Sequence, residues 1–418
     1  MKDISTLLSH DYVPALVNRL VRYCTLDTQS DRHIEDIPST PRQWELARLL
    51  MEELKSLGLS DVALDEHCYL IARLPATLGC ESLPCFALMA HMDTASDVPG
   101  SPVKPRVIEA YDGKAIRLSE TRTLDPEEFE DLKGHEGDTL VVTDGNTLLG
   151  ADDKAGVAEI MTALEWLVKN PQIAHGPMEI YFTPDEETGK GMNLFPLENV
   201  KAIACYTLDG GRSAEIEAEC FTAYAVQAKF LGKVIHIGAA RGKLANAVAM
   251  ASHFVSLLPR SESPEATDNW YGYYCPIEIK GTMEEAVVEI YLRDFEAQGM
   301  ERRISAMKAF AGAVEAQFPL GKVELTIKKQ YINMKEKLDQ RPEVMEKLRV
   351  AVEKTGAVPT MKPIRGGTDG SRLTEKGIPT PNVFTGGYNY HSRNEWASVA
   401  EMSLAVLTVK NLIQEWAR

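Results

Sequence analysis

Residues 148–169 read LLGADDKAGVAEIMTALEWLVK and join a short apolar run, an acidic pair and a helix-like segment. The apolar run ends at Leu149 and is followed, after Gly150 and Ala151, by Asp152 and Asp153. Residues 155–169 then place apolar side chains at helical spacing. The apolar stripe of this segment consists of Val157, Ile160, Met161, Leu164 and Leu167. A strand that passes through an acidic turn into a helix is typical of an α/β domain.

The same alternation continues on both sides of this stretch. Strand-like runs occur at 86–90, 178–182, 202–207 and 380–385. Helix-like segments occur at 41–58, 342–355 and 398–416. We therefore expect an α/β domain whose mixed central sheet is largely parallel and is flanked by helices.

The order of the predicted elements changes after about residue 215, where strands and helices are expected in the order βαββαβ. They are predicted at 222–232, 243–258, 274–281, 285–295, 298–316 and 322–331. A chain of 418 residues is too long for one compact core. The sequence therefore predicts an α+β domain at 217–330, inserted into a larger domain formed by residues 1–216 and 331–418.

Acidic residues or a histidine stand just beyond several of the apolar runs. The segments concerned are ALMAHMDT (87–94), LLGADDKAG (148–156), IYFTPDEETG (180–189) and ACYTLDGG (204–211). Ligands bind at the carboxyl ends of the strands in an open α/β sheet, so we expect these side chains to share one edge. The cluster would comprise His91, Asp93, Asp152, Asp153, Glu186, Glu187 and Asp209. Carboxylates gathered in this way repel one another unless cations neutralise them, and the pattern therefore predicts a metal site.

The ligand types indicate which metal this site would hold. Imidazole and carboxylate without thiolate suit catalytic zinc, for which cobalt or manganese can substitute. The carboxylates suffice for two ions that share a bridging ligand, as in hydrolases whose metal ions lie about 3.5–4 Å apart. A further imidazole is available from His391 in the segment GGYNYHSRNE (386–395).

Each of these features has an ordinary explanation when it is taken alone. Asp152 and Asp153 could begin a helix, since carboxylates favour helix N-termini. Glu186 and Glu187 could belong to a solvated loop, and Asp209 to a plain turn. The metal hypothesis rests on their joint occurrence at one structural position.

Composition and charge exclude several classes of protein. The formal net charge is −16, from 45 basic and 61 acidic residues, and no cluster of Lys and Arg typical of nucleic-acid binding stands out. An apolar run of about 18 residues, as a membrane span requires, does not occur. The N-terminal residues include charged and polar side chains where a signal peptide is apolar. The 7 cysteines form no CxxC pair, so we expect reduced thiols and a cytoplasmic protein.

Longer stretches of the sequence resemble a known family. They are TDGNTLLGADDKAGVAEIMTAL (143–164), FTPDEETGKG (182–191), KPIRGGTDG (362–370) and NVFTGGYNYH (382–391). The chain resembles the tripeptide aminopeptidase branch of the zinc metallopeptidases that include glutamate carboxypeptidase and aminoacylase. The resemblance extends from LDTQS (26–30) to the last helix. It implies a cytoplasmic enzyme with two zinc ions that removes the N-terminal residue from short peptides, and a homodimer formed through the inserted lid domain.

The resemblance also implies a set of metal ligands: His91, Asp152, Glu187, Asp209 and His391. Asp152 would bridge the two ions, with a cis peptide bond after it, and Asp93 would orient the imidazole of His91. Glu187 would complete the shell of one ion, and Asp209 would hold the other together with His391.

The remaining roles concern catalysis and substrate binding. Glu186 would act as the general base that takes a proton from the attacking water and passes it to the leaving amine. In the inserted domain, His236 would stabilise the oxyanion, although His-Ile-Gly stands at 236–238 where relatives have His-Pro-Gly. Asn246 and Arg293 match further positions of the lid. Arg365 would grip the carboxylate of the substrate, because a guanidinium offers two parallel donors.

Three alternatives remain open. A dipeptidase, an N-acyl amino acid deacylase or a carboxypeptidase of the same architecture would need the same zinc ligands. A non-catalytic scaffold would usually lack the general base, whereas Glu186 is present. A nucleotide-binding protein is suggested only by the glycine-rich segments RGGTDG and LGADDKAG, and neither is a GxxxxGK[ST] or a GxGxxG motif.

Overall fold

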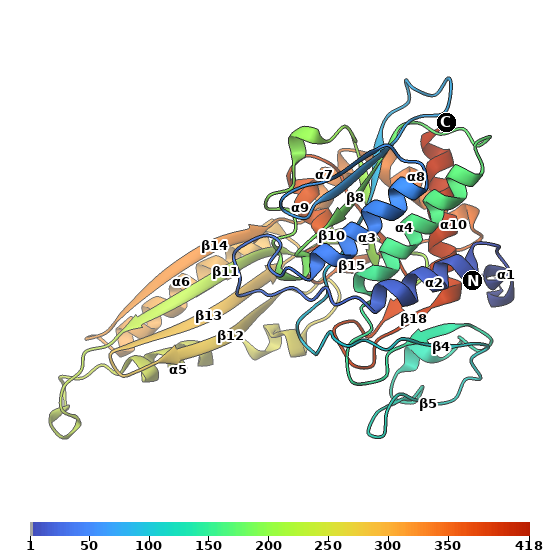
Figure 1. Cartoon of the computed structure of the whole chain (residues 1–418). Helices are drawn as coiled ribbons and strands as arrows, with labels where there is room; N and C mark the ends of the chain where they lie inside the picture. Colours follow the sequence, from blue (N-terminus) through green and yellow to red (C-terminus); the bar gives the residue numbers. More distant parts are fainter. Residues whose placement is uncertain (1–2) are drawn as a thin grey trace. The chain divides into compact units, whose positions relative to one another are not determined.

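The computed structural model describes residues 3–418, which divide into two compact units (Figure 1). Of the described residues, unit 1 comprises 3–218, Glu336–Lys362 and Thr368–Arg418, and unit 2 comprises Glu219–Lys335 and Pro363–Gly367. The predicted inserted domain, 217–330, did not include the short segment Pro363–Gly367. A segment of five residues is too short to show a period, so the sequence could not predict that it belongs to unit 2.

Unit 1 is built on an eight-stranded sheet with the order β1-β2-β8-β3-β9-β16-β10-β15. Its strands are β1 (Asp61–Leu64), β2 (Leu70–Leu74), β3 (Phe86–His91), β8 (Met178–Thr183), β9 (Cys205–Gly210), β10 (Glu215–Cys220), β15 (Thr360–Ile364) and β16 (Asn382–Phe384). The central strands β8, β3, β9 and β16 are parallel, whereas β1, β2 and β10 pair with their neighbours in antiparallel fashion. This arrangement confirms the predicted mixed sheet.

Helices cover this sheet because its strands are apolar on both faces. The helices of unit 1 are α1 (Ile4–Leu8), α2 (Val13–Cys24), α3 (Gln43–Ser56), α4 (Ala151–Lys169), α8 (Pro342–Lys354), α9 (Asp369–Glu375) and α10 (Val399–Trp416), and α7 (Lys335–Asp339) begins at the unit boundary. Helix α4 packs against β3 and β9 and is flanked by α2 and α10 (Figure 1). In β3, Leu88 belongs to the core beneath α4 and Met89 to the apolar cluster of the opposite face. This alternation follows from the two-residue period of a strand.

A glycine allows the start of α4 to lie directly on β9. A Cβ atom added at Gly156 would lie 1.9 Å from the backbone oxygen of Leu208. Any larger residue would push the helix away from the strand. The close approach brings the beginning of α4, with Asp152, next to the end of β9, with Asp209.

A second, small sheet of unit 1 was not predicted. It has the order β17-β18-β7-β4 and consists of β4 (Arg106–Ile108), β7 (Leu140–Val142), β17 (Gly387–Tyr388) and β18 (Trp396–Ser398). A separate hairpin joins β5 (Ile116–Arg117) and β6 (Thr123–Leu124). Strands of two or three residues are too short to show a period in the sequence. The loop between β17 and β18 carries His391, so this sheet fixes the ends of that loop.

Unit 2 is a four-stranded antiparallel sheet with two helices on one face. Its elements are β11 (Thr222–Leu231), α5 (Ala247–Ser256), β12 (Tyr273–Gly281), β13 (Glu285–Asp294), α6 (Ala297–Gln317) and β14 (Lys322–Tyr331), in the sheet order β12-β13-β11-β14. Alternate residues of β11, namely Val226, Ala228 and Phe230, are buried with the apolar residues of both helices. The element order is the predicted βαββαβ.

Short 3-10 helices complete the structure. They are η1 (Glu130–Leu132), η2 (Glu186–Thr188), η3 (Leu197–Asn199), η4 (Ile237–Ala239), η5 (Arg260–Glu262) and η6 (Pro264–Ala266). One strand prediction was displaced, because the strand expected at 202–207 is β9, at Cys205–Gly210. Within residues 3–418, none of the helices combines the length and the apolar character needed to cross a bilayer.

Candidate metal centre

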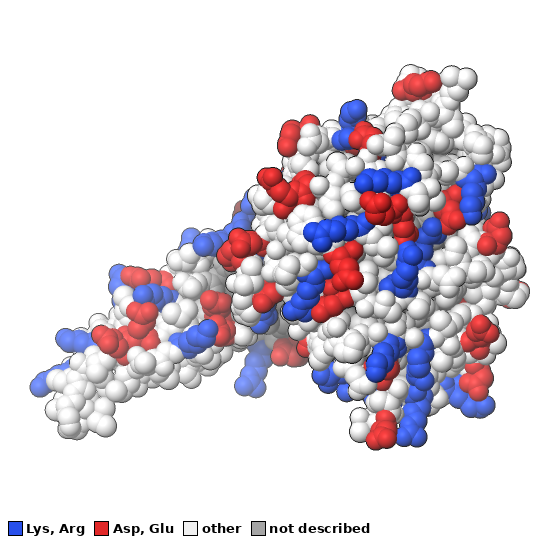
Figure 2. All heavy atoms as spheres, in the orientation of Figure 1, with Lys and Arg blue, Asp and Glu red and all other residues white. Residues whose placement is uncertain are grey.

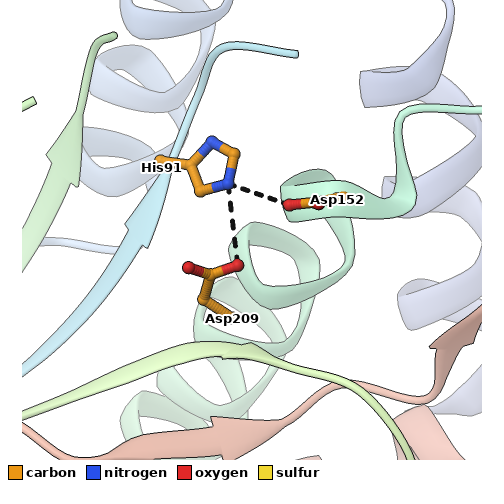
Figure 3. Close-up of side chains that lie close together, drawn as sticks. All are labelled: His91, Asp152 and Asp209. Atoms are coloured by element: carbon orange, nitrogen blue, oxygen red, sulfur yellow. Dashed lines mark hydrogen bonds and ion pairs between the residues drawn. The ribbon is translucent and has the colours of Figure 1, made fainter. Parts of the chain in front are cut away.

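The first group of candidate ligands lies at the carboxyl end of β3. His91 is the last residue of β3, Asp209 lies near the end of β9, and Asp152 lies in the first turn of α4. The Nε2 atom of His91 is 2.9 Å from Oδ1 of Asp152 and 3.6 Å from Oδ1 of Asp209 (Figure 3). The three side chains converge on one point, as a metal ion requires.

The second group shares Asp152 with the first. The Nε2 atom of His391 lies 3.3 Å from Oδ2 of Asp152 and 3.0 Å from Oε2 of Glu187. Asp152 therefore turns one carboxylate oxygen toward each imidazole. This is the geometry of a ligand that bridges two ions, and the peptide bond that follows Asp152 is cis.

The expected pairing of Glu187 and Asp209 was wrong. Asp209 lies with His91, and Glu187 lies with His391. The reason is the place of each carboxylate in the fold. Asp209 belongs to β9 itself, which pairs with β3, so its short side chain meets the end of that strand. Glu187 follows β8 in the turn η2, where its longer side chain lies next to the loop of His391.

The electrostatics of the cluster fit bound cations. Burial, with the charge of Asp152 nearby, raises the pKa of Glu187 to about 8, and Oε1 of Glu187 is a buried oxygen with no hydrogen-bond partner in the described chain. Hydrogen bonds to Asp152 and Glu187 raise the pKa of His391 to about 11. The positive charge of protonated imidazoles thus balances the negative charge of the carboxylates. Divalent ions would replace those protons on binding.

Asp93 connects the first histidine to the two glutamates. Its carboxylate is fully buried, and Oδ1 lies 3.3 Å from Nδ1 of His91. The same carboxylate accepts the backbone N–H of Glu186 at 2.9 Å and that of Glu187 at 3.2 Å. Asp93 can therefore orient an imidazole and hold the glutamate turn in place.

Glu186 belongs to neither ligand group, which leaves its carboxylate available for proton transfer. Burial raises its pKa well above the ordinary value for a glutamate, and the charges of Asp209 and Asp369 add to this shift. Asp185, which precedes it, has a positive φ of 56°, a conformation that non-glycine residues adopt at some cost.

The conformation at Asp185 is held by contacts with the N-terminal part of the chain. The carboxylate of Asp185 accepts hydrogen bonds from the backbone N–H of Ser39 at 2.6 Å and from Nε2 of Gln43 at 2.7 Å. The backbone N–H of Asp185 donates to Oε1 of Gln43 at 3.2 Å. These bonds fix the point from which the side chain of Glu186 departs.

Glu395 is a residue of the site that the sequence analysis missed. Its buried carboxylate accepts the backbone N–H groups of Leu149 at 2.7 Å, Gly150 at 2.8 Å and Asp152 at 3.2 Å. It thereby joins the loop of His391 to the loop of the shared aspartate. Its signal in the sequence was its position as the last residue of the quoted segment GGYNYHSRNE.

The four predicted substrate-binding residues lie in unit 2. His236 is exposed at the N-terminus of η4, where Nδ1 accepts the N–H of Gly238 at 3.2 Å. Asn246 caps α5 by accepting the N–H of Val248 at 3.0 Å. Arg293 is buried and stacks on the ring of Tyr291 at 4.7 Å.

Arg365, the fourth of these residues, holds a loop of unit 2. Its Nη1 atom donates to the backbone oxygens of Asn269 at 2.9 Å and Tyr271 at 2.8 Å, and Nη2 donates to that of Thr267 at 3.1 Å. The guanidinium also stacks on Phe221 at 5.2 Å. Binding of a substrate carboxylate, which stays a prediction, would require an exchange of some of these bonds.

Basic and acidic side chains are interspersed on the surface. On the face drawn in Figure 2, Lys and Arg alternate with Asp and Glu, and no extended field of basic side chains appears on it. Within unit 1, some basic and acidic side chains form ion pairs, such as Arg73 with Asp61 at 3.2 Å.

The chain matches a known protein family and several known proteins over most of its length. The model of peptidase family M20/M25/M40 matches residues 139–415. "Peptidase T" of Geobacillus sp. (strain WCH70) is 42% identical over 401 residues, which cover 96% of this chain and 98% of that protein. "Peptidase T" of Bacillus subtilis (strain 168) is 41% identical over 403 residues, with 96% and 98% covered.

Solved structures show the same fold. The aminopeptidase PepT from Bacillus cereus ATCC 10987 superposes with a TM-score of 0.75 at 25% identity, and a tripeptidase from Staphylococcus aureus subsp. aureus Mu50 with a TM-score of 0.78 at 22% identity. Each comparison covers 97% of this chain and 99% of the other.

Proposed function

The chain belongs to peptidase family M20/M25/M40, and on that premise we propose that it is a metal-dependent aminopeptidase that removes the N-terminal residue from tripeptides. The observation that carries the proposal is the shared carboxylate of Asp152, with Oδ1 at 2.9 Å from Nε2 of His91 and Oδ2 at 3.3 Å from Nε2 of His391. Glu186, outside both ligand groups, supports a hydrolytic rather than a purely structural role for the site. The names of the relatives support peptides as substrates.

The donor set supports two Zn²⁺ ions, with Co²⁺ or Mn²⁺ able to replace them. His91, Asp152 and Asp209 would hold one ion, and Asp152, Glu187 and His391 the other. When bound, such ions supply a water whose pKa falls from 15.7 to about 7 and a polarised substrate carbonyl.

The protein's own residues would then carry out the proton transfer. Glu186 accepts a proton as water attacks the scissile carbonyl, and it delivers that proton to the nitrogen of the leaving amine. Burial raises the pKa of its carboxyl group above the ordinary value, which is the direction that a general acid–base carboxylate requires. Asp93 keeps the backbone of Glu186 in place throughout.

Unit 2 would supply substrate recognition. His236, Asn246 and Arg293 are proposed to contact the peptide, and Arg365 to bind its C-terminal carboxylate. We also propose that unit 2 acts as a lid, that two copies of the chain form a homodimer through it, and that the enzyme works in the cytoplasm on short peptides.

The experiment that tests the function is a panel of substrates. Purified protein is assayed with unblocked di-, tri- and tetrapeptides and with N-acyl amino acids, before and after a chelator and after added Zn²⁺. Release of the N-terminal residue mainly from tripeptides, lost on chelation and restored by zinc, is expected. Turnover of dipeptides or acylated amino acids alone would replace the tripeptidase assignment, and no turnover by folded, zinc-loaded protein would favour a scaffold.

A further inference from the structure

The two histidines of the metal centre differ in exposure. The side chain of His91 is 2% exposed and that of His391 is 42% exposed. The ring of His91 is held from its far side, since Nδ1 lies 3.0 Å from the backbone oxygen and 3.3 Å from Oδ1 of Asp93. An exposed histidine needs an equivalent support if its Nε2 atom is to meet a metal ion in a fixed orientation.

A second aspartate stands in that position for His391. The Nδ1 atom of His391 lies 3.2 Å from Oδ2 of Asp97. Both imidazoles thus present Nε2 to the carboxylate cluster and Nδ1 to an aspartate, and both aspartates belong to the segment HMDTASD (91–97). The sequence predicted a role for Asp93 and none for Asp97.

We propose that Asp97 is a positioning residue, which orients His391 and fixes its tautomer so that Nε2 binds the ion shared with Asp152 and Glu187. The inference rests on the proposed metal centre. A neutral imidazole carries one N–H, and a carboxylate that accepts it from Nδ1 leaves the lone pair of Nε2 free for the metal. The same contact makes the ring a stronger ligand.

The backbone holds Asp97 in place although its side chain is 65% exposed. Gln29 spans the loop, with Nε2 donating to the backbone oxygens of Ala95 and Val98, both at 2.8 Å. These two residues flank Asp97 closely on either side. Gln29 belongs to LDTQS (26–30), a segment that has no other assigned role in the site.

Two further contacts complete this anchor. The backbone N–H of Ser30 donates to the oxygen of Thr94 at 3.1 Å, and that of Leu148 donates to the oxygen of Pro99 at 3.0 Å. The loop 94–100 is therefore tied to the N-terminal segment and to the residues that precede the shared Asp152. Such support is what a short, exposed aspartate needs to act on a histidine far away in the sequence.

The test is the affinity of the two ions, measured separately. Asp97→Asn, Asp97→Ala and the control Asp36→Asn, an exposed aspartate in another loop of unit 1, are titrated with Zn²⁺ against a chromophoric chelator. In both Asp97 variants, one ion, the one assigned to His391, should bind about 10–100-fold more weakly. The affinity for the other ion should change by less than about twofold. Asp97→Glu, which keeps a carboxylate, should recover most of the affinity, and Gln29→Ala should show a smaller loss of the same ion.

A double-mutant cycle with His391→Ala shows whether Asp97 acts through the histidine. Adding Asp97→Asn to His391→Ala should weaken neither remaining site further. Equal weakening of both ions, or unchanged binding in Asp97→Asn and Asp97→Ala, would overturn the proposal. Failure of the wild-type protein to bind two ions would instead refute the proposed metal centre, so the two failures are distinguishable.

Discussion

The carboxylate of Asp93 accepts the backbone N–H of Glu186 at 2.9 Å, so the residue that faces His91 also fixes the start of the turn that carries the proposed base. The two functions proposed for the site, metal binding and proton transfer, therefore share one buried aspartate. A change at Asp93 should disturb both, whereas a change at Glu186 should disturb only one.

Replacing Asp93 by Asn should lower both zinc affinity and kcat/KM for a tripeptide, each by about 10–100-fold. The amide retains one acceptor oxygen, so it cannot accept the backbone N–H groups of both Glu186 and Glu187 as the two carboxylate oxygens do. Zinc titration and steady-state kinetics at saturating Zn²⁺ measure the two effects. If excess zinc restored the full activity of the Asp93→Asn variant, Asp93 would act only in metal binding.

Replacing Glu186 by Gln should lower kcat by about 10²–10⁴-fold and leave both ions bound. The amide keeps the shape of the side chain but cannot accept a proton. Kinetics and metal analysis of the same sample check this. The matched control is Glu198→Gln, an exposed glutamate of the following 3-10 helix η3, which should behave as wild type. Wild-type turnover by Glu186→Gln would remove Glu186 from the mechanism.

Replacing Glu395 by Gln should weaken the binding of both ions, because the Asp152 whose backbone Glu395 holds belongs to both ligand groups. The amide group of Gln would also face backbone N–H groups that need an acceptor, at a cost of about 1–3 kcal/mol in folding stability. Zinc titration and denaturant unfolding of the metal-free protein test the two effects. Weakening of one ion only would contradict the role in positioning Asp152.

Replacing Arg365 by Lys should raise KM for tripeptides about tenfold if the guanidinium binds the C-terminal carboxylate, since Lys offers no parallel pair of donors. The control is a substrate, the corresponding tripeptide amide, whose KM should not change. An equal rise of KM for both substrates would show that Arg365 acts only by holding the loop at 267–271.

Glu159 provides a prediction about stability and pH. This residue of α4 is fully buried, and both carboxylate oxygens are without a hydrogen-bond partner in the described chain. Burial raises its pKa well above the ordinary value. The protonated form of Glu159 is therefore favoured in the folded state. The contribution of Glu159 to the free energy of unfolding is fully present below the unfolded pKa of about 4.3 and is lost as the pH rises toward the folded pKa.

Glu159→Gln should remove this pH dependence and should be more stable than wild type at pH 8. Each pH unit between the two pKa values contributes about 1.4 kcal/mol. Urea unfolding with a chelator present, at pH 5 and pH 8, measures the difference. The control Glu120→Gln, at an exposed position, should follow the wild type at both pH values.

The sequence could predict that much of the candidate site lies together, because several of its residues stand at the ends of apolar strands. His91 and Asp209 close β3 and β9, and such endings are visible in the sequence as a polar residue after an apolar run. The helical spacing of α4 and α10 was equally readable. The pairing of Glu187 with His391 was not, because it depends on the path of the turn after β8 rather than on any period.

Asp97 and Glu395 escaped prediction for a related reason. Each acts through a contact with a residue that is distant in the sequence, at 3.2 Å from Nδ1 of His391 and at 3.2 Å from the backbone nitrogen of Asp152. Neither follows an apolar strand that could have marked it. The short strands β17 and β18, which fix the ends of the loop of His391, carry no readable period either.

The wide separation of the ligands along the chain has a consequence for biosynthesis. His91, Asp152, Glu187 and Asp209 leave the ribosome well before His391, and at about 5–20 residues per second this interval lasts on the order of 10–40 s. During that time one ligand group can already be complete while the other lacks its imidazole. On the proposed metal centre, the ligand group of His91 would therefore be complete earlier in synthesis than the ligand group of His391.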